Sequence, residues 1–226
     1  MTTPISRRKI LLSGAALTTL TLPGCQSLPS FSLTEAVRRL LTLASQNAFA
    51  TLLQPGGFYD SSVARIALPD RFGGNNGSGI AAAILQSRVF RERLQRQLNR
   101  AAEKGAERAA PLVADVVRNV SIQDAAALVR GGPQAASTFL RGQMDTALVN
   151  AMLPGISDGL RVFDDQIISQ AVRSVTGFDV AALAQDITRK ADDSIWASIG
   201  LEESNIRADP RKTNDPVLIG VFGLLN

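Results

Sequence analysis

The sequence contains no histidine and only one cysteine in 226 residues, and each absence excludes a class of site. Without histidine there is no Ser-His-Asp triad, no histidine-ligated zinc site and no histidine general base. A single cysteine cannot form a disulfide within the chain, so packing has to hold the fold together. No residue pattern points to catalysis, and we therefore expect no cofactor, no metal and no catalytic residue.

Aromatic residues are also few, at 5% of the chain, whereas Ala, Leu and Val help to bring the hydrophobic content to 45%. This composition favours helices packed on helices, in a chain long enough to bury a core. The formal net charge is +4, but three of the 24 cationic residues precede an apolar run that we expect to be removed, namely Arg7, Arg8 and Lys9. The remaining 21 cations against 20 acids give a nearly neutral mature chain, which argues against a nucleic-acid partner.

Residues 1–24 have the pattern of a secretory signal peptide. The basic stretch Ser6-Arg7-Arg8-Lys9 precedes an apolar run that ends at Leu22 and is too short to span a bilayer core of about 30 Å. The run leads into Leu22-Pro23-Gly24-Cys25, which resembles a bacterial lipobox, where the cysteine is acylated and becomes the first residue of the mature chain. The start of the stretch also resembles a twin-arginine export signal.

We therefore predict a lipoprotein signal peptide over 1–24, a lipidated tether over 25–31 and a single helical domain over 32–226. Acylated Cys25 would anchor the protein to the membrane of the bacterial cell envelope, facing the periplasm. Gln26 follows Cys25 where Asp would indicate retention at the inner membrane, and this favours the outer membrane. The alternative interpretation of Cys25 is a buried structural thiol.

The longest regular pattern runs from Gln86 to Val120 and predicts a central amphipathic helix. Apolar or small residues recur there at helical spacing and form one stripe that needs neighbours to cover it: Phe90, Leu94, Leu98, Ala101, Ala102, Gly105, Ala109, Leu112, Val113, Val116, Val117 and Val120. Helical signals recur along the whole chain and hairpin signals do not. The predicted fold is all-α, a multi-helix bundle around this one long helix.

Capping residues and breakers predict the other elements. Ser32 and Glu35 form an S-x-x-E capping box, so a helix should begin at Leu33 and end at Gln54-Pro55-Gly56-Gly57. An extended segment over 58–69 and a flexible glycine-rich loop over 73–79 should follow.

In the second half of the chain, Ser121 and Asp124 should cap a short helix, and Pro133 should open a helix that runs to Leu153 and breaks at Pro154-Gly155. We predict further helices over 156–175 and from Asp179 to Gly200, and a terminal apolar piece over 217–225 that docks on the bundle.

Several motifs in order resemble the bacterial domain of unknown function 4197 family. They are Leu53-Gln54-Pro55-Gly56-Gly57-Phe58, Val63-Ala64-Arg65-Ile66-Ala67-Leu68-Pro69, Leu98-Asn99-Arg100-Ala101-Ala102-Glu103-Lys104, Ile122-Gln123-Asp124-Ala125 with Gly131-Gly132, Ala135-Ala136-Ser137-Thr138-Phe139-Leu140-Arg141, and Asp209-Pro210 with Val221-Phe222-Gly223. The resemblance covers nearly everything from Glu35 to Gly223. It implies a helical, exported or lipid-anchored protein, and it brings no activity, cofactor or catalytic residue.

One of these motifs contains a polar cluster that we take as the candidate site. Asp124 and Arg141 would approach it if the short helix folds back, which gives the six residues Asn99, Arg100, Glu103, Lys104, Asp124 and Arg141. Such a cluster is either a binding site or a buried structural network, and the sequence does not choose between them.

Two further charge patterns have a functional and a structural interpretation. Cations recur every four residues at Arg96, Arg100, Lys104 and Arg108, which suits lipopolysaccharide phosphates or an anionic membrane face, or local ion pairing with Glu92, Glu103 and Glu107. The acidic pairs Asp164-Asp165, Asp192-Asp193 and Glu202-Glu203 invite a glycosidase or metal site. Sequential neighbours on a helix do not face one another, so solvated surfaces or caps are favoured for these pairs.

These observations support three hypotheses. The leading one is a non-enzymatic, lipid-anchored helical module that binds an envelope protein, lipid or cell-wall partner or supports envelope structure. The alternative is a periplasmic carrier that holds a lipid or another apolar ligand between helices rich in Ala, Val and Leu. The weaker alternative is a carboxylate-dependent hydrolase.

Overall fold

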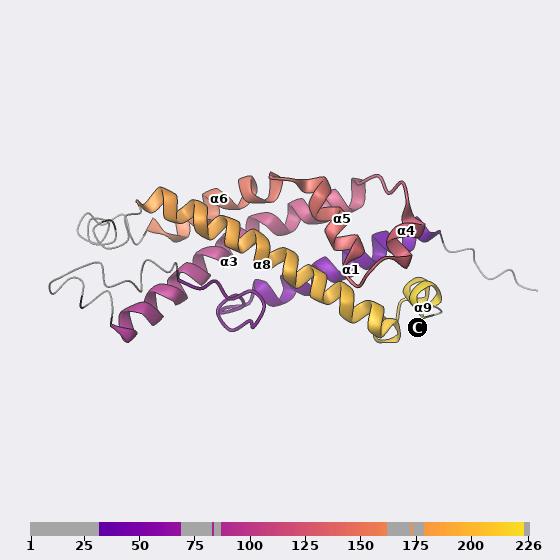
Figure 1. Cartoon of the computed structure of the whole chain (residues 1–226), viewed down its shortest axis with the longest axis horizontal. Coiled ribbons are helices and arrows are strands. Elements are labelled where there is room, and N and C mark those ends of the chain that lie inside the picture. The colour runs from indigo at the N-terminus through magenta and orange to yellow at the C-terminus, as the bar shows by residue number, and fades with distance from the viewer. Residues whose placement is uncertain (1–31, 69–82, 84–86, 162–172, 174–178, 224–226) are drawn as a thin grey trace, which may run out of the picture. The chain divides into compact units, whose positions relative to one another are not determined.

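A computed structural model of the chain describes residues 32–68, 83, 87–161, 173 and 179–223, which all fall in the unit over residues 31–226. Within the described residues every regular element is helical, and seven α-helices pack together (Figure 1). The prediction of an all-α bundle is confirmed. The signal peptide, Cys25, the tether, the 73–79 loop and the pair Asp164-Asp165 lie outside the described residues.

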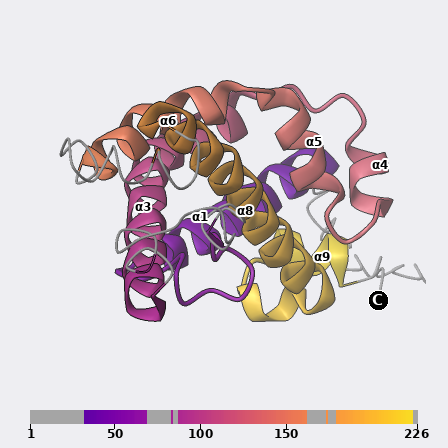
Figure 2. The same ribbon diagram turned by 60° about the vertical axis from the view of Figure 1, so that its left-hand side comes forward.

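The helices follow one another along the chain with short connections. They are α1 (Leu33–Leu52), α3 (Arg88–Asn119), α4 (Ala125–Arg130), α5 (Ala135–Met144), α6 (Ala147–Gly159), α8 (Val180–Ala208) and α9 (Pro216–Phe222), with a 3-10 turn at Pro210–Thr213. The predicted central helix is α3, which is continuous through Pro111. It packs on α6, α1 and α8 (Figures 1 and 2). Its apolar stripe, including Leu94, Leu98 and Val113, is buried in the core.

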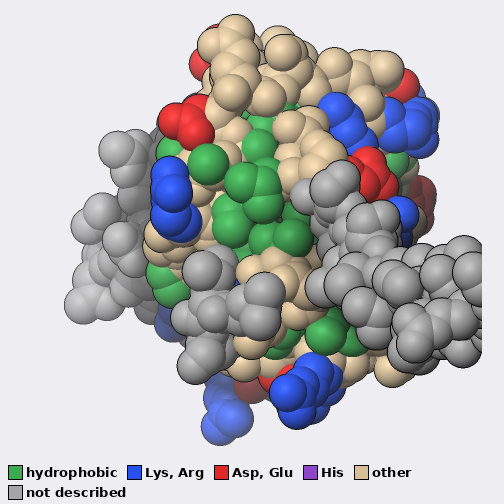
Figure 3. Space-filling model, turned by 90° about the vertical axis from the view of Figure 1, so that its right-hand side faces the viewer, with side chains coloured by type: hydrophobic (Ala, Val, Ile, Leu, Met, Phe, Trp, Pro, Cys, Tyr) green, Lys and Arg blue, Asp and Glu red, His purple; other side chains and the backbone are tan. Residues whose placement is uncertain are grey.

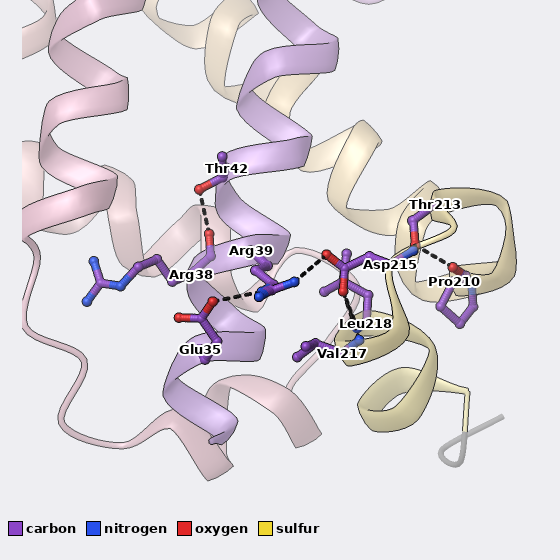
Figure 4. Close-up of polar contacts among 9 residues, drawn as sticks. All are labelled: Glu35, Arg38, Arg39, Thr42, Pro210, Thr213, Asp215, Val217 and Leu218. Atoms are coloured by element: carbon purple, nitrogen blue, oxygen red, sulfur yellow. Dashed lines mark hydrogen bonds and ion pairs between the residues drawn. The ribbon is translucent and has the colours of Figure 1, made fainter. Parts of the chain in front are cut away.

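Helix α1 begins where the capping box predicts, but the box itself does not form. Ser32, the first described residue, makes no side-chain cap hydrogen bond within the described structure. Glu35 instead accepts a hydrogen bond from Arg39 Nε at 2.7 Å, one helical turn further on (Figure 4). The position of the helix start was therefore predictable from Ser32, whereas the partner of Glu35 was not.

The same arginine fastens the carboxyl-terminal helix to α1. Arg39 Nη1 lies 3.0 Å from Asp215 Oδ2, while Asp215 Oδ1 accepts the Val217 amide hydrogen at 2.8 Å at the start of α9 (Figure 4). Burial opposes ionisation of Asp215, but hydrogen bonds from Arg39 and from backbone amides outweigh burial and hold its pKa below the ordinary value of 3.8. Because Leu218 and Phe222 are buried, the prediction that this terminal piece docks on the bundle is confirmed.

The predicted break at Pro154-Gly155 is wrong. The chain turns ten residues earlier at Asp145, which has φ 45°, and α6 then runs through Pro154 without a break. Gly155 is buried in α6 because it packs against α3, where a Cβ atom would lie 2.6 Å from the Lys104 carbonyl oxygen. Close packing of two helices thus outweighs the breaking tendency of the dipeptide.

The predicted end of the last long helix at Gly200 is also wrong. Asp179 caps the start as expected and accepts the Ala182 amide hydrogen at 2.7 Å, but α8 continues to Ala208. Gly200 is buried inside the helix, where a Cβ atom would meet the side chain of Gln134 at 2.9 Å. Here too a glycine that resembles a terminator serves a close contact between elements.

One face of the bundle exposes apolar side chains. Figure 3 shows hydrophobic side chains gathered at the centre of the face that carries α4 and α9 in Figure 1, with charged side chains around them. Partly buried hydrophobic residues of these elements, such as Leu128 and Val221, pack on the core. In the part of the chain that the structure describes, no helix combines the length and the apolar character that crossing a membrane requires.

Candidate functional site

The turn that follows α1 is fixed against the middle of α3. After Leu52 the chain reverses at Gly56, whose φ of 84° lies in the left-handed region that glycine adopts at little cost. Glu103 on α3 accepts the Gly56 amide hydrogen at 3.1 Å, and Phe58 is completely buried beneath the turn. A glycine turn, a buried aromatic ring and one carboxylate therefore set the distance between the turn and α3.

Asn99 holds the segment that follows this turn. Its side-chain amide pairs with both backbone groups of Ile66, accepting from the nitrogen at 2.9 Å and donating to the oxygen at 2.9 Å. It also donates to the Gln95 carbonyl oxygen at 2.7 Å, and its side chain is almost fully buried. Asn99 thus replaces a neighbouring strand for a stretch of chain that lies against α3, which is a structural role.

Replacing Asn99 by Ala should lower the free energy of unfolding by about 1 to 3 kcal/mol, because both backbone groups of Ile66 lose their partner inside the core. Denaturant unfolding measures this loss, and limited trypsin digestion should cleave faster after Arg65. Gln95→Ala is the matched control, since Gln95 reaches the Ile66 oxygen only at 3.4 Å. Equal stability of the two variants would contradict the assigned role.

Between the turn and α3 lies an open cleft of about 540 Å³. Its walls come from the turn on one side and from one face of α3 on the other: Pro55, Gly56, Tyr59, Asp60, Arg96, Arg100, Glu103, Lys104 and Glu107. The guanidinium groups of Arg65 and Arg96 lie over the Tyr59 ring, at 4.9 and 5.3 Å from its centre. A hydrogen bond with Tyr59 is the main cause that raises the pKa of Arg96. The ring thus orients Arg96 along the cleft.

Most of the charged groups in this cleft have no partner in the protein. Within the described ranges, the side chains of Arg100, Lys104, Glu107 and Asp60 make no hydrogen bond or ion pair. Elsewhere on α3 charges do pair: Arg88 with Glu92 at 2.8 Å and, across to α6, Arg108 with Asp158 at 3.3 Å. The cleft is therefore a place where side chains of both signs face solvent with their bonding capacity unused.

The cation series read from the sequence divides at this point. Its first three members line the cleft, and Arg108 pairs with Asp158 instead. The alternative of local ion pairing holds for Glu92, which pairs with Arg88. Glu103 binds the Gly56 amide. The acids near the cations thus leave them free in the cleft.

Glu103 is the cleft acid with a perturbed affinity for protons. Burial raises its pKa above the ordinary value of 4.5, although backbone hydrogen bonds from Phe58 and Gly56 act in the opposite direction. The folded state therefore binds this proton more tightly than the unfolded state does. The contribution of Glu103 to stability falls as pH rises from 4.5 through the higher folded pKa.

Asp124 and Arg141, the other two residues of the predicted cluster, make their contacts at other places. Asp124 caps α4 and accepts the Ala127 amide hydrogen at 2.8 Å. Arg141 on α5 binds the acidic pair of α8, reaching Asp192 at 2.8 Å and also Asp193. The four remaining residues of the predicted cluster share one region of α3, where Asn99 is internal and the other three line the cleft.

Two of the acidic pairs are engaged in internal contacts. Burial raises the pKa of Asp192 against the effect of Arg141, and its Oδ1 accepts the Trp196 ring hydrogen at 3.1 Å. Glu203 is completely buried and binds Arg207 at 2.7 Å. These carboxylates hold helices together, which the sequence pattern had left open.

Tyr59 and Asp60 are cleft residues that the sequence analysis missed. They directly follow the motif that ends at Phe58, so proximity to the motif was the available signal. The side of α3 on which the turn would land depends on the buried contacts of Phe58 and Asn99. Those contacts join segments far apart in the chain.

The fold and the cleft define a class: an all-helical protein with an open cleft of mixed charge on its longest helix. Within that class, the chain belongs to the family described as protein of unknown function (DUF4197), whose model matches residues 27–223. Comparison with curated proteins and with solved structures gives no match. Among the described residues, no group of three or more Cys, Asp or Glu side chains is placed to hold a metal ion.

Proposed function

We propose that this protein is a non-enzymatic binding module of the bacterial cell envelope, anchored through acylated Cys25, with the cleft on α3 as its ligand site. The observation that carries the proposal is the set of unpaired charges around the cleft. Charged residues three or four apart on a helix stabilise it when their signs are opposite. At the cleft the chain forgoes this gain and keeps Arg100, Lys104 and Glu107 available to a ligand.

The anchoring part of the proposal rests on the lipobox-like sequence. The family match begins at residue 27, so everything it describes follows Cys25, as removal of residues 1–24 requires. A tether over 25–31 reaches at most about 25 Å when fully extended. A ligand site on the domain would then stay close to the membrane surface, where envelope components are concentrated.

The carrier alternative has one observation in its favour. A second groove of about 500 Å³ lies on the other side of the turn, between the end of α1 and α8. Apolar residues line part of it, among them Ala48, Leu52, Val63 and Leu201. An apolar ligand would occupy this groove, whereas a polar ligand would occupy the cleft. The hydrolase alternative is less well supported, because Glu103 already accepts the Gly56 amide hydrogen.

The test uses the full chain with Cys25→Ser. We expect this variant to leave the membrane fraction and, after purification without detergent, to show a polar adduct in native mass spectrometry. Adding Arg100→Gln and Lys104→Gln should remove the adduct, whereas Arg108→Gln, which changes a cation paired with Asp158, should not. Continued sedimentation of the Cys25→Ser chain with membranes would contradict the anchor. A lipid adduct that survives the cleft substitutions would favour the carrier, and a bare polypeptide would count against both.

A further inference from the structure

The charges along the cleft are sorted by sign into rows. On α3, residues four apart lie one above the other, and Arg96, Arg100 and Lys104 form a row of cations while Glu103 and Glu107 form a row of acids. Like charges at this spacing destabilise a helix. The Arg88–Glu92 pair on the same helix shows the opposite arrangement, in which neighbours of opposite sign bind at 2.8 Å.

The turn extends the acidic side of the cleft. Asp60 acts electrostatically on both Arg96 and Glu103, which places its carboxylate between the two helix rows and the turn. The lining then holds three cationic and three acidic side chains, so its formal charge cancels. A simple anion would gain from one row and be repelled by the other, and a simple cation would meet the reverse. A ligand that carries both charges gains from both rows.

Resting on the proposed binding function, the geometry points to a small zwitterion, with a phosphate or carboxylate beside a primary ammonium, as the ligand of this cleft. The anionic group binds Arg100 and Lys104, whose backbone positions are about 6 Å apart along the helix axis. A guanidinium donates in pairs to phosphate or carboxylate oxygens. The ammonium group, with three donors, binds the free carboxylates of Glu107 and Asp60.

The remaining charged side chains of the cleft act as supports. Arg96 is held over the Tyr59 ring, and Glu103 is held by the Gly56 amide. The cleft volume of about 540 Å³ falls within the usual range for small-molecule sites, which is about 300 to 1,000 Å³. A headgroup-sized molecule or an amino acid with two charged ends fits this space.

The experiment is a calorimetric titration of the full chain carrying Cys25→Ser. O-phosphoethanolamine and diaminopimelate test the phosphate and carboxylate forms of the zwitterion. Inorganic phosphate and ethanolamine test each end alone, and phosphocholine tests an ammonium group without N–H donors. At least one zwitterion should bind roughly ten-fold or more tightly than inorganic phosphate or ethanolamine, because charge-assisted hydrogen bonds form at both ends.

Substitutions then assign the two ends of the ligand. Arg100→Gln with Lys104→Gln should abolish binding, and Glu107→Gln should reduce the affinity for the zwitterion to that for its anionic fragment. Arg108→Gln and Glu92→Gln are the matched controls, because both residues lie on α3 but are paired elsewhere. Circular dichroism spectra confirm that each variant remains helical.

Each outcome separates the ligand class from the proposed function. Equal affinity for a zwitterion and for inorganic phosphate would overturn the zwitterion and leave a simple anion site. Weak binding of all probes, while a native adduct still depends on Arg100 and Lys104, would overturn the ligand class and keep the binding module. If no probe binds and no adduct forms, both fail. Binding that survives the cleft substitutions would place the zwitterion at another site.

Discussion

Replacing Glu203 by Ala is expected to lower the free energy of unfolding by about 3 to 5 kcal/mol, because it leaves a buried guanidinium without its carboxylate. Glu203 is completely buried on α8, and its partner Arg207 keeps only 11% of its side chain exposed. The carboxylate also accepts the Ala136 and Ser137 amide hydrogens at 3.0 and 2.6 Å, at the start of α5. A loss of this size is a large fraction of the stability of an ordinary domain, about 5 to 15 kcal/mol.

The effect spreads because this pair connects three helices. Arg207 donates to the Val129 carbonyl oxygen at 3.0 Å and to the Leu128 oxygen at 2.9 Å, near the end of α4. The carboxylate thus caps the start of one helix while the guanidinium caps the end of the preceding one. Removing Glu203 therefore frees the whole connection between α4 and α5 from α8.

Thermal unfolding measures the Glu203→Ala effect as a fall in Tm of about 6 to 20 °C. Glu202→Ala is the matched control, since this neighbouring carboxylate makes one exposed contact, with Asn47 at 3.3 Å. It should change the free energy of unfolding by no more than about 0.5 kcal/mol. Equal melting of the two variants would mean that the buried network is absent in solution.

The sequence predicted the starts of helices better than their ends. Asp124 and Asp179 were assigned as caps, and both accept a backbone amide hydrogen three residues on, at 2.8 and 2.7 Å. Capping is a local event, so its signal lies within a few residues of sequence. The misplaced ends at Gly155 and Gly200 depend on contacts with Lys104 and Gln134, which are distant in the chain.

The same distinction explains what the sequence revealed of the candidate site. Three cleft residues, Arg100, Glu103 and Lys104, were found together because one motif of α3 contains them. Asp60 was missed because it reaches the cleft only through the fold of the turn after α1. The motifs that carry the family resemblance meet in the structure, where Gly56 binds Glu103 and Ile66 binds Asn99. Part of that shared pattern therefore maintains the wall opposite the cleft's charges.

The second large effect is expected at the contact between α3 and α6. Two glycines of α6 allow the helices to approach closely: a Cβ atom at Gly155 would lie 2.6 Å from the Lys104 oxygen, and one at Gly159 would lie 2.7 Å from the Ala101 Cα atom. Backbone atoms cannot move aside as a flexible side chain can. The combined change of Gly155→Ala and Gly159→Ala should therefore force α6 away from α3.

Each of these substitutions should lower the free energy of unfolding by about 1 to 3 kcal/mol, as overpacking of a filled core usually does. Gly142→Ala in α5 is the matched control, because no atom lies within 4 Å of the added Cβ there. An alanine in an exposed helix interior should instead raise stability by about 0.5 to 1 kcal/mol. Opposite shifts in denaturant unfolding would thus separate close packing from helix propensity, and a stabilising double substitution would contradict the α3–α6 contact.

This prediction also bears on the cleft, because Gly155 contacts the backbone of Lys104, a cleft residue. A displaced α3 would change the spacing between its charged face and the turn held by Glu103. Under conditions where the double variant is still folded, ligand affinity should therefore fall although none of the cleft residues has changed. Unchanged affinity together with reduced stability would mean that the turn moves with α3 and that Asn99 and Glu103 keep the cleft as one rigid piece.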